Sequence, residues 1–527
     1  MLTKSNADEI QSYLSDASYM DSGNADRVVL PESAEEVAEI LIRAGQDRTP
    51  VTVSGAGTGT VAGRVPCGGI VLATDNLNCI KSLRHDGESG RAVVEAGVVL
   101  ADLQRFVEAQ GLFYPPDPTE RSCFIGGNVA TNASGARTFK YGPTRNYVER
   151  LKVCLATGEI LDVRRGEFRA DAGNRISVPL SARHTLEAQL PSYHMPQVRK
   201  NASGYYVTPA VDVIDLFIGS EGTLGVVTEI EVALIKKPEG ILSGVVFFNA
   251  KDSVLSFVRE ARTLSLANRQ RPGAHSLGPL MEKALEVSER RDVSQPELNP
   301  EKSRRIDARA LEYFDRESLT FLRQKYDSVP SSAAGAIFFE QEITASSEDE
   351  VMSEWLSLLE KHQALVDESW FAANEQDQMK LREFRHALPV LMNEWFARYN
   401  QRKISTDMSV PDEEFAGMLA YYEEQLEASK LRYTIFGHIG DNHVHVNILP
   451  RDDGEAAQGR EIYWKFVRRA VKVGGTISAE HGIGKLKREY LRELYGEKHL
   501  QEMAALKKAF DPMGILGRGN IFDEKYL

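Results

Sequence analysis

The chain has 527 residues, of which 42% are hydrophobic and 26% are charged. These proportions are typical of a globular protein, and the length suits two or three domains of ~100–200 residues. The net charge of −13 argues against nucleic-acid binding, because phosphate contacts need a basic face. The sequence has neither a secretory signal nor an apolar run near the ~20 residues of a membrane span. We therefore expect a cytoplasmic protein, and peripheral contact with the inner membrane stays open.

The four cysteines, Cys67, Cys79, Cys123 and Cys154, show no CxxC spacing. Scattered cysteines in a cytoplasmic protein are usually reduced. We expect buried thiols and neither a disulfide framework nor an iron–sulfur site.

The first half alternates strand and helix signals. Runs rich in β-branched residues predict strands at 49–53, 69–72, 92–95 and 148–155. Residues 33–43 predict an amphipathic helix, with Ser33 as N-cap and Glu36 completing a capping box. Helices alternating with strands favour a layered α/β arrangement.

The second half has a different pattern. Residues 244–248 and 336–340 predict strands, and 347–365 predicts a helix. The charged, proline-bearing stretch at 267–305 predicts helices and an exposed insertion. Pro512 should end a helix that begins near 497. These signals indicate a second domain of α+β type.

Three glycine-rich segments, at 53–60, 125–135 and 219–229, are each tied to a predicted strand. Glycine lets backbone N–H groups approach an anionic ligand closely, so such segments suit a long phosphate-bearing ligand. A Rossmann fingerprint is excluded, because position 60 is threonine and the glycines and prolines at 63–69 prevent a helix. A P-loop is excluded because Gly-Lys-Ser/Thr is absent.

Four motifs make the pattern specific: Gly-Ala-Gly-Thr-Gly at 55–59, Pro-Pro-Asp-Pro at 115–118, Ile-Gly-Gly-Asn-Val-Ala-Thr-Asn-Ala at 125–133 and Gly-Ser-Glu-Gly-Thr-Leu-Gly-Val at 219–226. Together they resemble the FAD domain of the vanillyl-alcohol oxidase/p-cresol methylhydroxylase (PCMH) superfamily, in the branch of the D-lactate dehydrogenases and glycolate oxidase large subunits.

The resemblance implies an α+β protein with a two-part, PCMH-type FAD-binding domain at 1–238. It also implies an α+β cap domain with an antiparallel sheet at 239–508, and a tail at 509–527 that returns to the FAD domain. FAD should bind non-covalently, because no histidine adjoins the loop at 54–60.

The resemblance also assigns the FAD contacts. The pyrophosphate would meet Ser54, Gly55, Ala56, Gly57, Thr58, Gly59 and Thr60. The isoalloxazine and ribityl region would meet Pro116, Asp117, Gly126, Gly127, Asn128, Thr131, Ser134 and Gly135. The adenosine half would meet Glu221, Gly222 and Val227. The segment 164–209 is longer than the family pattern, and it is interpreted as a lid, a partner surface or a loop without function.

The segments 437–447 and 478–482 hold four of the eleven histidines. Alternation over 441–447 predicts a strand with His443 and His445 on one face, and two imidazoles with a carboxylate suit Zn²⁺. The family pattern instead points to His438 and His445, so the chain must bend between them.

By resemblance, Glu480 is the third ligand of Zn²⁺ or another divalent metal, and His481 is the general base. Asn447 joins the catalytic set. In the alternative interpretation, these histidines only bond one another and the flavin. His443 stands where the family has asparagine, and a substrate contact or a satisfied polar residue is favoured over ligation.

Arg385 matches the cap-domain arginine that holds a substrate carboxylate; the alternative is a solvated helix arginine. Pro389 and Ser405 replace the threonine and lysine that hold substrate in some relatives, so a monocarboxylate fits better. The resemblance implies oxidation of a D-2-hydroxy acid, of the D-lactate or glycolate type, to the 2-oxo acid. The alternatives are a flavin-carrying subunit of an electron-transfer complex and a same-fold enzyme acting on another alcohol. The electron acceptor and a homodimer stay open.

Overall fold

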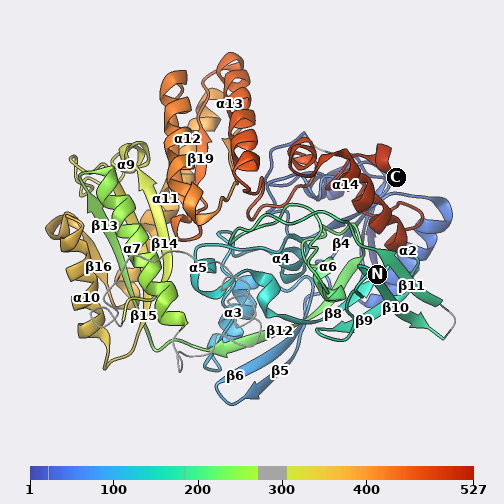
Figure 1. Ribbon diagram of the computed structural model, residues 1–527. Coiled ribbons are helices and arrows are strands. Elements are labelled where there is room, and N and C mark those ends of the chain that lie inside the picture. The colour runs from blue at the N-terminus through green and yellow to red at the C-terminus, as the bar shows by residue number, and fades with distance from the viewer. Residues whose placement is uncertain (22, 183, 271–304) are drawn as a thin grey trace. The chain divides into compact units, whose positions relative to one another are not determined.

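The computed structural model describes residues 1–21, 23–182, 184–270 and 305–527, which form two compact units (Figure 1). The first unit combines 1–134, 143–237 and 476–527, and the second combines 135–142 with 238–475. The sequence analysis set the domain boundaries at 238/239 and 508/509. The insertion expected at 267–305 lies mostly outside the described residues.

The first unit begins with a four-stranded sheet in the order β1-β2-β4-β3, in which β2 and β3 run parallel to β4. The strands are β1 Leu2–Lys4, β2 Arg27–Leu30, β3 Val51–Ser54 and β4 Ile70–Ala73. The helices here are α1 Ala7–Ile10 and α2 Ala34–Asp47. Val37 and Leu41 of α2 pack with Val51 and Leu72 in one buried cluster. The predicted strands at 49–53 and 69–72 are therefore confirmed.

The start of α2 shows why the helix begins there. The Ser33 hydroxyl accepts the N–H of Glu36 at 3.2 Å, as the predicted N-cap requires. The Glu36 carboxylate accepts the N–H of Glu32 at 2.9 Å instead of that of Ser33. The predicted helix is confirmed, and the reciprocal bond of the capping box is displaced by one residue.

The second sheet of this unit has six strands in the order β5-β6-β12-β8-β9, with β7 paired to β12. The strands are β5 Ile80–Asp86, β6 Ser89–Glu95, β7 Leu112–Phe113, β8 Val148–Cys154, β9 Ile160–Arg164 and β12 Val226–Lys236. The helices are α3 Leu100–Glu108, α4 Ile125–Thr131, α6 Val213–Phe217 and α14 Arg488–Phe510. This confirms the strands predicted at 92–95 and 148–155, and α14 ends before Pro512 as expected.

The long segment at 164–209 contains a separate two-stranded ribbon of β10 Arg175–Ser181 and β11 His184–Gln189. The residues after the ribbon are docked on α14. Ser192 donates its backbone N–H to Glu502 at 2.7 Å, and the rings of Tyr193 and Tyr495 lie 4.2 Å apart between centroids. The described residues of this segment therefore pack within the first unit.

The second unit is built on a seven-stranded antiparallel sheet in the order β16-β13-β15-β14-β18-β19-β17. The resemblance implied an antiparallel sheet here, without its number or order of strands. The strands are β13 Gly240–Phe248, β14 Ala308–Asp315, β15 Gly335–Ile343, β16 Trp370–Ala372, β17 Ile404–Ser405, β18 Tyr433–Gly437 and β19 His445–Ile448. The helices are α5 Thr138–Tyr141, α7 Lys251–Arg269, α9 Arg316–Leu322, α10 Glu348–Lys361, α11 Glu375–Tyr399, α12 Phe415–Ser429 and α13 Asp453–Lys472.

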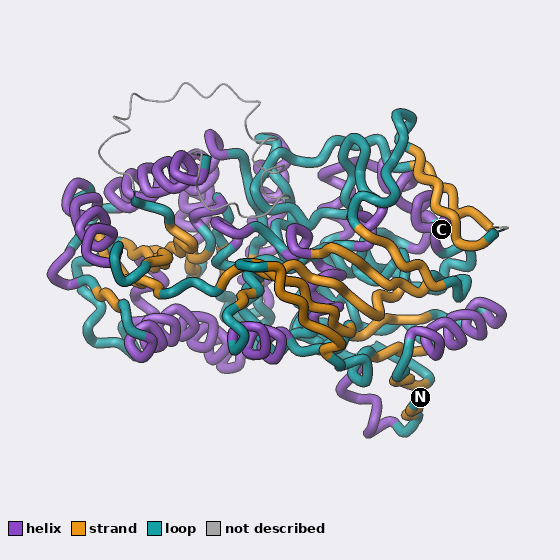
Figure 2. The backbone as a smooth tube through the Cα atoms, turned by 90° about the horizontal axis from the view of Figure 1, so that it is seen from below, coloured by secondary structure: helices purple, strands orange, loops and turns teal. Residues whose placement is uncertain are grey.

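Helices cover both faces of this sheet, and Figure 2 shows strands between helices. On one face Phe247 and Phe338 pack with Phe384 and Leu388 of α11. On the other face Trp355 of α10 stacks on Phe339 at 4.2 Å between ring centroids. The sheet is therefore buried on both sides, so any charge carried inward by its strands must be paired.

Two expectations about bulk properties have different outcomes. No helix among the described residues is long and apolar enough to cross a membrane. All four thiols are free, as expected, but Cys67 and Cys79 are exposed, so the prediction of buried thiols was wrong for these two. Cys67 lies in the loop before β4 and Cys79 in the loop before β5.

Candidate functional site

The three glycine-rich segments come together within the first unit. A Cβ atom added to Gly55 would lie 3.9 Å from the Cα of Gly127, and one added to Gly222 would lie 3.3 Å from the Val53 side chain. The N–H of Glu221 donates to the carbonyl of Ala130 at 2.8 Å. The structure thus gathers segments that are far apart in the sequence around the ends of β3 and α4.

The backbone at this junction fits a cofactor that lies against main chain. Apart from their chain neighbours and the backbone of the same helix, no described residue has an atom within 4 Å of the Cβ positions of Gly59 and Gly127. A Cβ on Gly126, in contrast, would lie 2.7 Å from that of Ala96. Gly57 and Gly222 have φ of 81° and 71°, a region that side chains rarely adopt. Open space beside Gly59 and Gly127 would admit FAD, and the close packing at Gly126 would hold the backbone of the cradle in place.

The residues assigned to FAD occupy the following places: 54–60 at the end of β3 and in the loop after it, 116–117 after β7, 126–131 in α4, Ser134 beyond it, 221–222 before β12, and Val227 within β12. Gly135 falls in the second unit, where its N–H donates to the Thr138 hydroxyl at 2.9 Å. The Thr131 hydroxyl donates to the carbonyl of Gly127 at 3.1 Å. These contacts fix the local shape of α4 and of the turn after it.

Arg64 lies beside the loop after β3 and was missed by the sequence analysis. It donates to the Gly55 carbonyl at 2.8 Å, to the Ser54 hydroxyl at 3.1 Å and to the Ser15 carbonyl at 2.8 Å. Burial lowers the pKa of its guanidinium. A cation so close to a predicted phosphate loop is a signal that sequence reading could have used.

Glu221 holds the loop that follows His481. Its carboxylate accepts the N–H groups of Ile483 at 2.6 Å and Gly484 at 2.7 Å. Burial raises the pKa of this carboxyl above its ordinary value, and the two N–H donors oppose that rise. The side chain of a residue assigned to the adenosine half therefore also shapes the segment that carries the predicted base.

Glu480 also lies in the first unit, where its carboxylate is held from one side. One oxygen accepts from the Lys200 ammonium at 3.0 Å and from the Ser134 hydroxyl at 3.2 Å. The other oxygen lies 3.7 Å from Nε2 of His481. The N–H of Ala202 donates to the carbonyl of Ser478 at 2.8 Å, so the segment that contains Lys200 is bonded to the segment that contains Glu480. Lys200 is thus the buried counter-charge of Glu480.

In the second unit, the chain turns sharply between His438 and His445. β18 ends at Gly437 with φ of 123°, a 3-10 turn covers Ile439–Asp441, and Asn442 has φ of 53°. The predicted bend is confirmed. The alternative of a strand over 441–447 was wrong, because β19 begins only at His445.

Three imidazoles lie together around this turn. The ring centroids of His438 and His445 are 5.6 Å apart, and those of His443 and His445 are 4.5 Å apart. Each of the three offers a nitrogen within 4.8 Å of the nitrogens of the other two. Nε2 of His443 also lies 3.0 Å from a carboxylate oxygen of Asp407, and both side chains are fully buried.

The hydrogen bonds of two of these rings suit a divalent metal. Nδ1 of His438 lies 2.6 Å from the Glu312 carboxylate, and Nδ1 of His445 lies 2.9 Å from the carbonyl of Thr406. A carbonyl can only accept, so the neutral His445 ring has its proton on Nδ1 and its lone pair on Nε2. Metal-binding histidines usually have this arrangement, so the donor set fits a divalent ion.

Arg385 lies on α11 and is mostly buried, with 12% of its side chain exposed. Its Nε lies 3.1 Å from the second oxygen of Glu312. Arg385 is therefore no solvated helix arginine. Sequence analysis missed Glu312, although an acidic residue in the otherwise apolar run Ala310–Phe314 was an available signal.

Asn447 and Ser405 are cross-strand partners on β19 and β17. Asn447 is fully buried and donates through Nδ2 to the carbonyl of His445 at 3.3 Å. In the part of the chain that the structure describes, Oδ1 of Asn447 and the Ser405 hydroxyl have no hydrogen-bond partner. Two such atoms on neighbouring strands are suited to a polar ligand.

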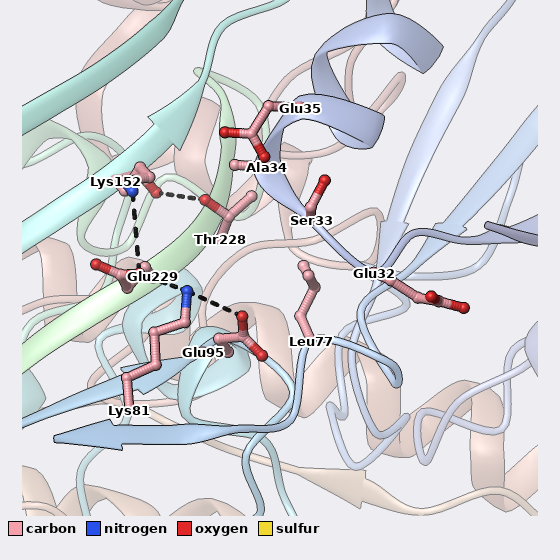
Figure 3. Close-up of a pocket in the computed structure, with 10 residues that line it drawn as sticks. All are labelled: Glu32, Ser33, Ala34, Glu35, Leu77, Lys81, Glu95, Lys152, Thr228 and Glu229. Atoms are coloured by element: carbon pink, nitrogen blue, oxygen red, sulfur yellow. Dashed lines mark hydrogen bonds and ion pairs between the residues drawn. The ribbon is translucent and has the colours of Figure 1, made fainter.

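A cavity of about 200 Å³ lies elsewhere in the first unit, near the start of α2 (Figure 3). Lys81 forms ion pairs there with Glu95 at 3.0 Å and Glu229 at 2.7 Å. None of the residues assigned to FAD, metal or substrate lines it. Four glutamates and two lysines line it, and Lys81 pairs with two of these glutamates, so the cavity is the site of an ion-pair cluster.

A glycine-lined cradle in one unit and an imidazole, arginine and carboxylate cluster in the other define a flavin-dependent oxidoreductase. Residues 25–164 match the FAD binding domain family, and residues 300–521 match the family of FAD linked oxidases, C-terminal domain.

Whole-chain relatives agree with these matches. Glycolate oxidase subunit GlcD of Bacillus subtilis (strain 168) is 30% identical over 517 residues, which cover 97% of this chain and 92% of that protein. D-lactate dehydrogenase of Anaerostipes hadrus is 31% identical over 513 residues, which cover 95% and 90%. The chain belongs to the FAD-linked oxidases, which confirms the resemblance and the fold class.

A solved structure supports the fold at a greater distance. Alkyldihydroxyacetonephosphate synthase has a TM-score of 0.64 and 15% identity, over 98% of this chain and 83% of its own. At this identity, the likeness concerns the fold alone.

Proposed function

We propose that this protein oxidises a D-2-hydroxy acid to the 2-oxo acid with non-covalently bound FAD. Relatives over the whole chain are named glycolate oxidase subunit, D-lactate dehydrogenase and D-2-hydroxyglutarate dehydrogenase. One observation carries the proposal: the Glu312 carboxylate contacts both Arg385 and His438. A 2-hydroxy acid has a carboxylate next to a hydroxyl, and an arginine beside a metal-binding imidazole matches that pair of groups.

In this mechanism, Arg385 pairs with the substrate carboxylate and fixes the orientation of the adjacent carbon. His438, His445 and Glu480 would hold a divalent ion such as Zn²⁺, which supplies Lewis acidity to the hydroxyl. His481 takes the hydroxyl proton as general base. FAD supplies the acceptor for the hydride that leaves C2, so the alcohol loses one proton and one hydride to give the ketone.

The substrate we propose is a monocarboxylate. Asn447 and Ser405 offer neutral polar atoms, and Pro389 has no side-chain donor. A second carboxylate would need a cation to offset its desolvation, and Asn447, Ser405 and Pro389 supply none.

Electrons must then leave for an acceptor outside the chain. The four thiols are free and have no cluster spacing, which supports a separate acceptor. The location we propose is the cytoplasm, where peripheral contact with the inner membrane would bring a membrane acceptor within reach.

Replacing His481 with alanine tests the proposal. Removal of a general base slows proton transfer by about 10²–10⁴-fold, so anaerobic flavin bleaching by D-lactate should nearly disappear while FAD stays bound. His499→Ala is the control, since His499 lies on α14 and its Nδ1 bonds the carbonyl of Tyr495 at 2.6 Å. Undiminished single-turnover bleaching in the His481 variant would contradict the assigned role.

A further inference from the structure

Glu312 occupies an unusual position for a carboxylate. It lies near the middle of β14, in a sheet packed on both faces, and only 4% of its side chain is exposed. β14 pairs with β18 so that Tyr313 lies opposite Gly437. Continued by one residue, this antiparallel register sets Glu312 opposite His438, just beyond the end of β18.

The two oxygens of Glu312 contact different partners. Oε1 lies 2.6 Å from Nδ1 of His438, and Oε2 lies 3.1 Å from Nε of Arg385. Arg385 comes from α11, which packs on the sheet through Phe384 and Leu388. One carboxylate thus connects His438, just beyond β18, with Arg385 of α11, which lies 53 residues earlier in the sequence.

Each contact fixes a property that the reaction needs. An acceptor at Nδ1 selects the tautomer of His438 whose lone pair lies on Nε2, and it orients the ring. A bond through Nε sets the plane of the Arg385 guanidinium, whose further donors can bind a carboxylate in bidentate fashion only in the correct plane.

We infer that Glu312 is a positioning residue that sets the metal-binding imidazole of His438 and the substrate-binding guanidinium of Arg385 with one carboxylate. This inference rests on the proposed function, and it adds a residue that acts through both binding groups. Removing its charge should weaken metal binding and substrate binding together, whereas loss of either partner alone would change one of them.

Glu340 provides a matched control. It lies on β15 of the same sheet, and its side chain is also 4% exposed. Its carboxylate is 2.8 Å from Nε of Arg309 and 3.5 Å from Nε of Arg137. Among the described residues its ion-pair partners are all arginines. Glu340→Gln therefore disturbs an equally buried ion pair without touching an imidazole.

The test compares Glu312→Gln, Glu312→Asp and Glu340→Gln in the full-length, FAD-loaded protein. Zinc affinity is measured by competition with a chromophoric chelator, and KM and kcat are measured with D-lactate. We expect Glu312→Gln to raise the zinc Kd by about 10–100-fold, as loss of a carboxylate behind a metal-binding histidine usually does. KM should rise about tenfold in the same variant, since a charged hydrogen bond that orients Arg385 is lost.

Glu312→Asp keeps the charge but shortens the reach, so at least one of the two values should rise even if the glutamine variant does not fold. Glu340→Gln should leave both within twofold of the parent. Values for both Glu312 variants that equal those of Glu340→Gln would overturn the inference.

Failure of the proposed function is recognised separately. A parent protein that neither binds zinc nor is bleached by any 2-hydroxy acid would refute that function and the inference with it. A parent that is bleached but binds no zinc would refute the half of the inference that concerns His438, and KM still decides the half that concerns Arg385.

Discussion

The two units build their binding groups from different parts of the chain. In the first unit the cradle is backbone: Gly55 lies beside Gly127, and Gly222 lies against the Val53 side chain. In the second unit the groups are charged side chains buried in a covered sheet, with Glu312 between His438 and Arg385. The first arrangement depends on the absence of side chains, and the second depends on exact pairing of charges in low dielectric.

This difference determines how each unit should respond to change. A backbone cradle is insensitive to pH and sensitive to a single added methyl group. A buried charge network tolerates little change in protonation, because each unpaired charge bears a desolvation penalty. Amino-acid substitutions and changes of pH should therefore affect the two units differently.

The largest expected effect concerns Asp315, which ends β14 and caps α9. Burial raises the pKa of this carboxyl to about 7, although the Ser318 N–H donates to it. The unfolded chain loses this proton near pH 4, while the folded chain keeps it until about pH 7. The free energy of unfolding should thus fall as pH rises from 4 to 7, by about 4 kcal/mol if Asp315 acts alone.

Asp315→Asn keeps the cap and removes the titration. Urea unfolding at pH 5 and pH 8 should show the variant gaining stability over the parent as pH rises.

The pH dependence that Glu340 adds to the free energy of unfolding has the opposite sign. Burial would raise its pKa, but Arg309 and Arg137 lower it to about 2, so its contribution is lost only in strong acid. A difference between variant and parent that stays constant with pH would contradict the account of Asp315.

An intermediate effect is expected from Arg385→Met, which keeps the length of the side chain and removes the guanidinium. KM for the 2-hydroxy acid should rise about 10–100-fold, which corresponds to about 1.5–3 kcal/mol for a hydrogen bond to a charged group. Arg382→Met is the matched control, one turn earlier on α11, where Arg382 donates to Gln378 at 3.2 Å. Equal KM values in the two variants would remove Arg385 from the substrate site.

The smallest effects test the backbone cradle by adding one methyl group. Gly126→Ala should lower stability by about 1–3 kcal/mol, since its Cβ would lie 2.7 Å from that of Ala96. The new Cβ of Gly127→Ala would meet no atom within 4 Å among the described residues outside its own helix, so the thermal midpoint should be unchanged while FAD affinity falls. Thermal unfolding and flavin retention on gel filtration separate the two. Tight FAD binding by Gly127→Ala would exclude this face as the cradle.

The same contrast explains what the sequence could predict. Each glycine motif is a short continuous stretch, so its role could be predicted from neighbouring residues alone. Strands such as 49–53 and 69–72 follow from runs of β-branched residues. The bend after Gly437 followed from the family pattern, which assigns both His438 and His445 to the metal, and Gly437 and Gly440 allow it. Glu312 was not predicted, because its role depends on strand register and on a helix far away in sequence. Arg64 and Lys200 acquire their partners in the same non-local way.

Anaerobic bleaching of the FAD-loaded protein by paired D- and L-2-hydroxy acids tests the central claim most directly. The account predicts rapid loss of flavin absorbance with D-lactate or another small D-2-hydroxy monocarboxylate, and no loss with its L enantiomer. It also predicts that the His481→Ala variant binds FAD but is not bleached. An oxidised flavin spectrum that persists with every D-2-hydroxy acid tested would contradict the account.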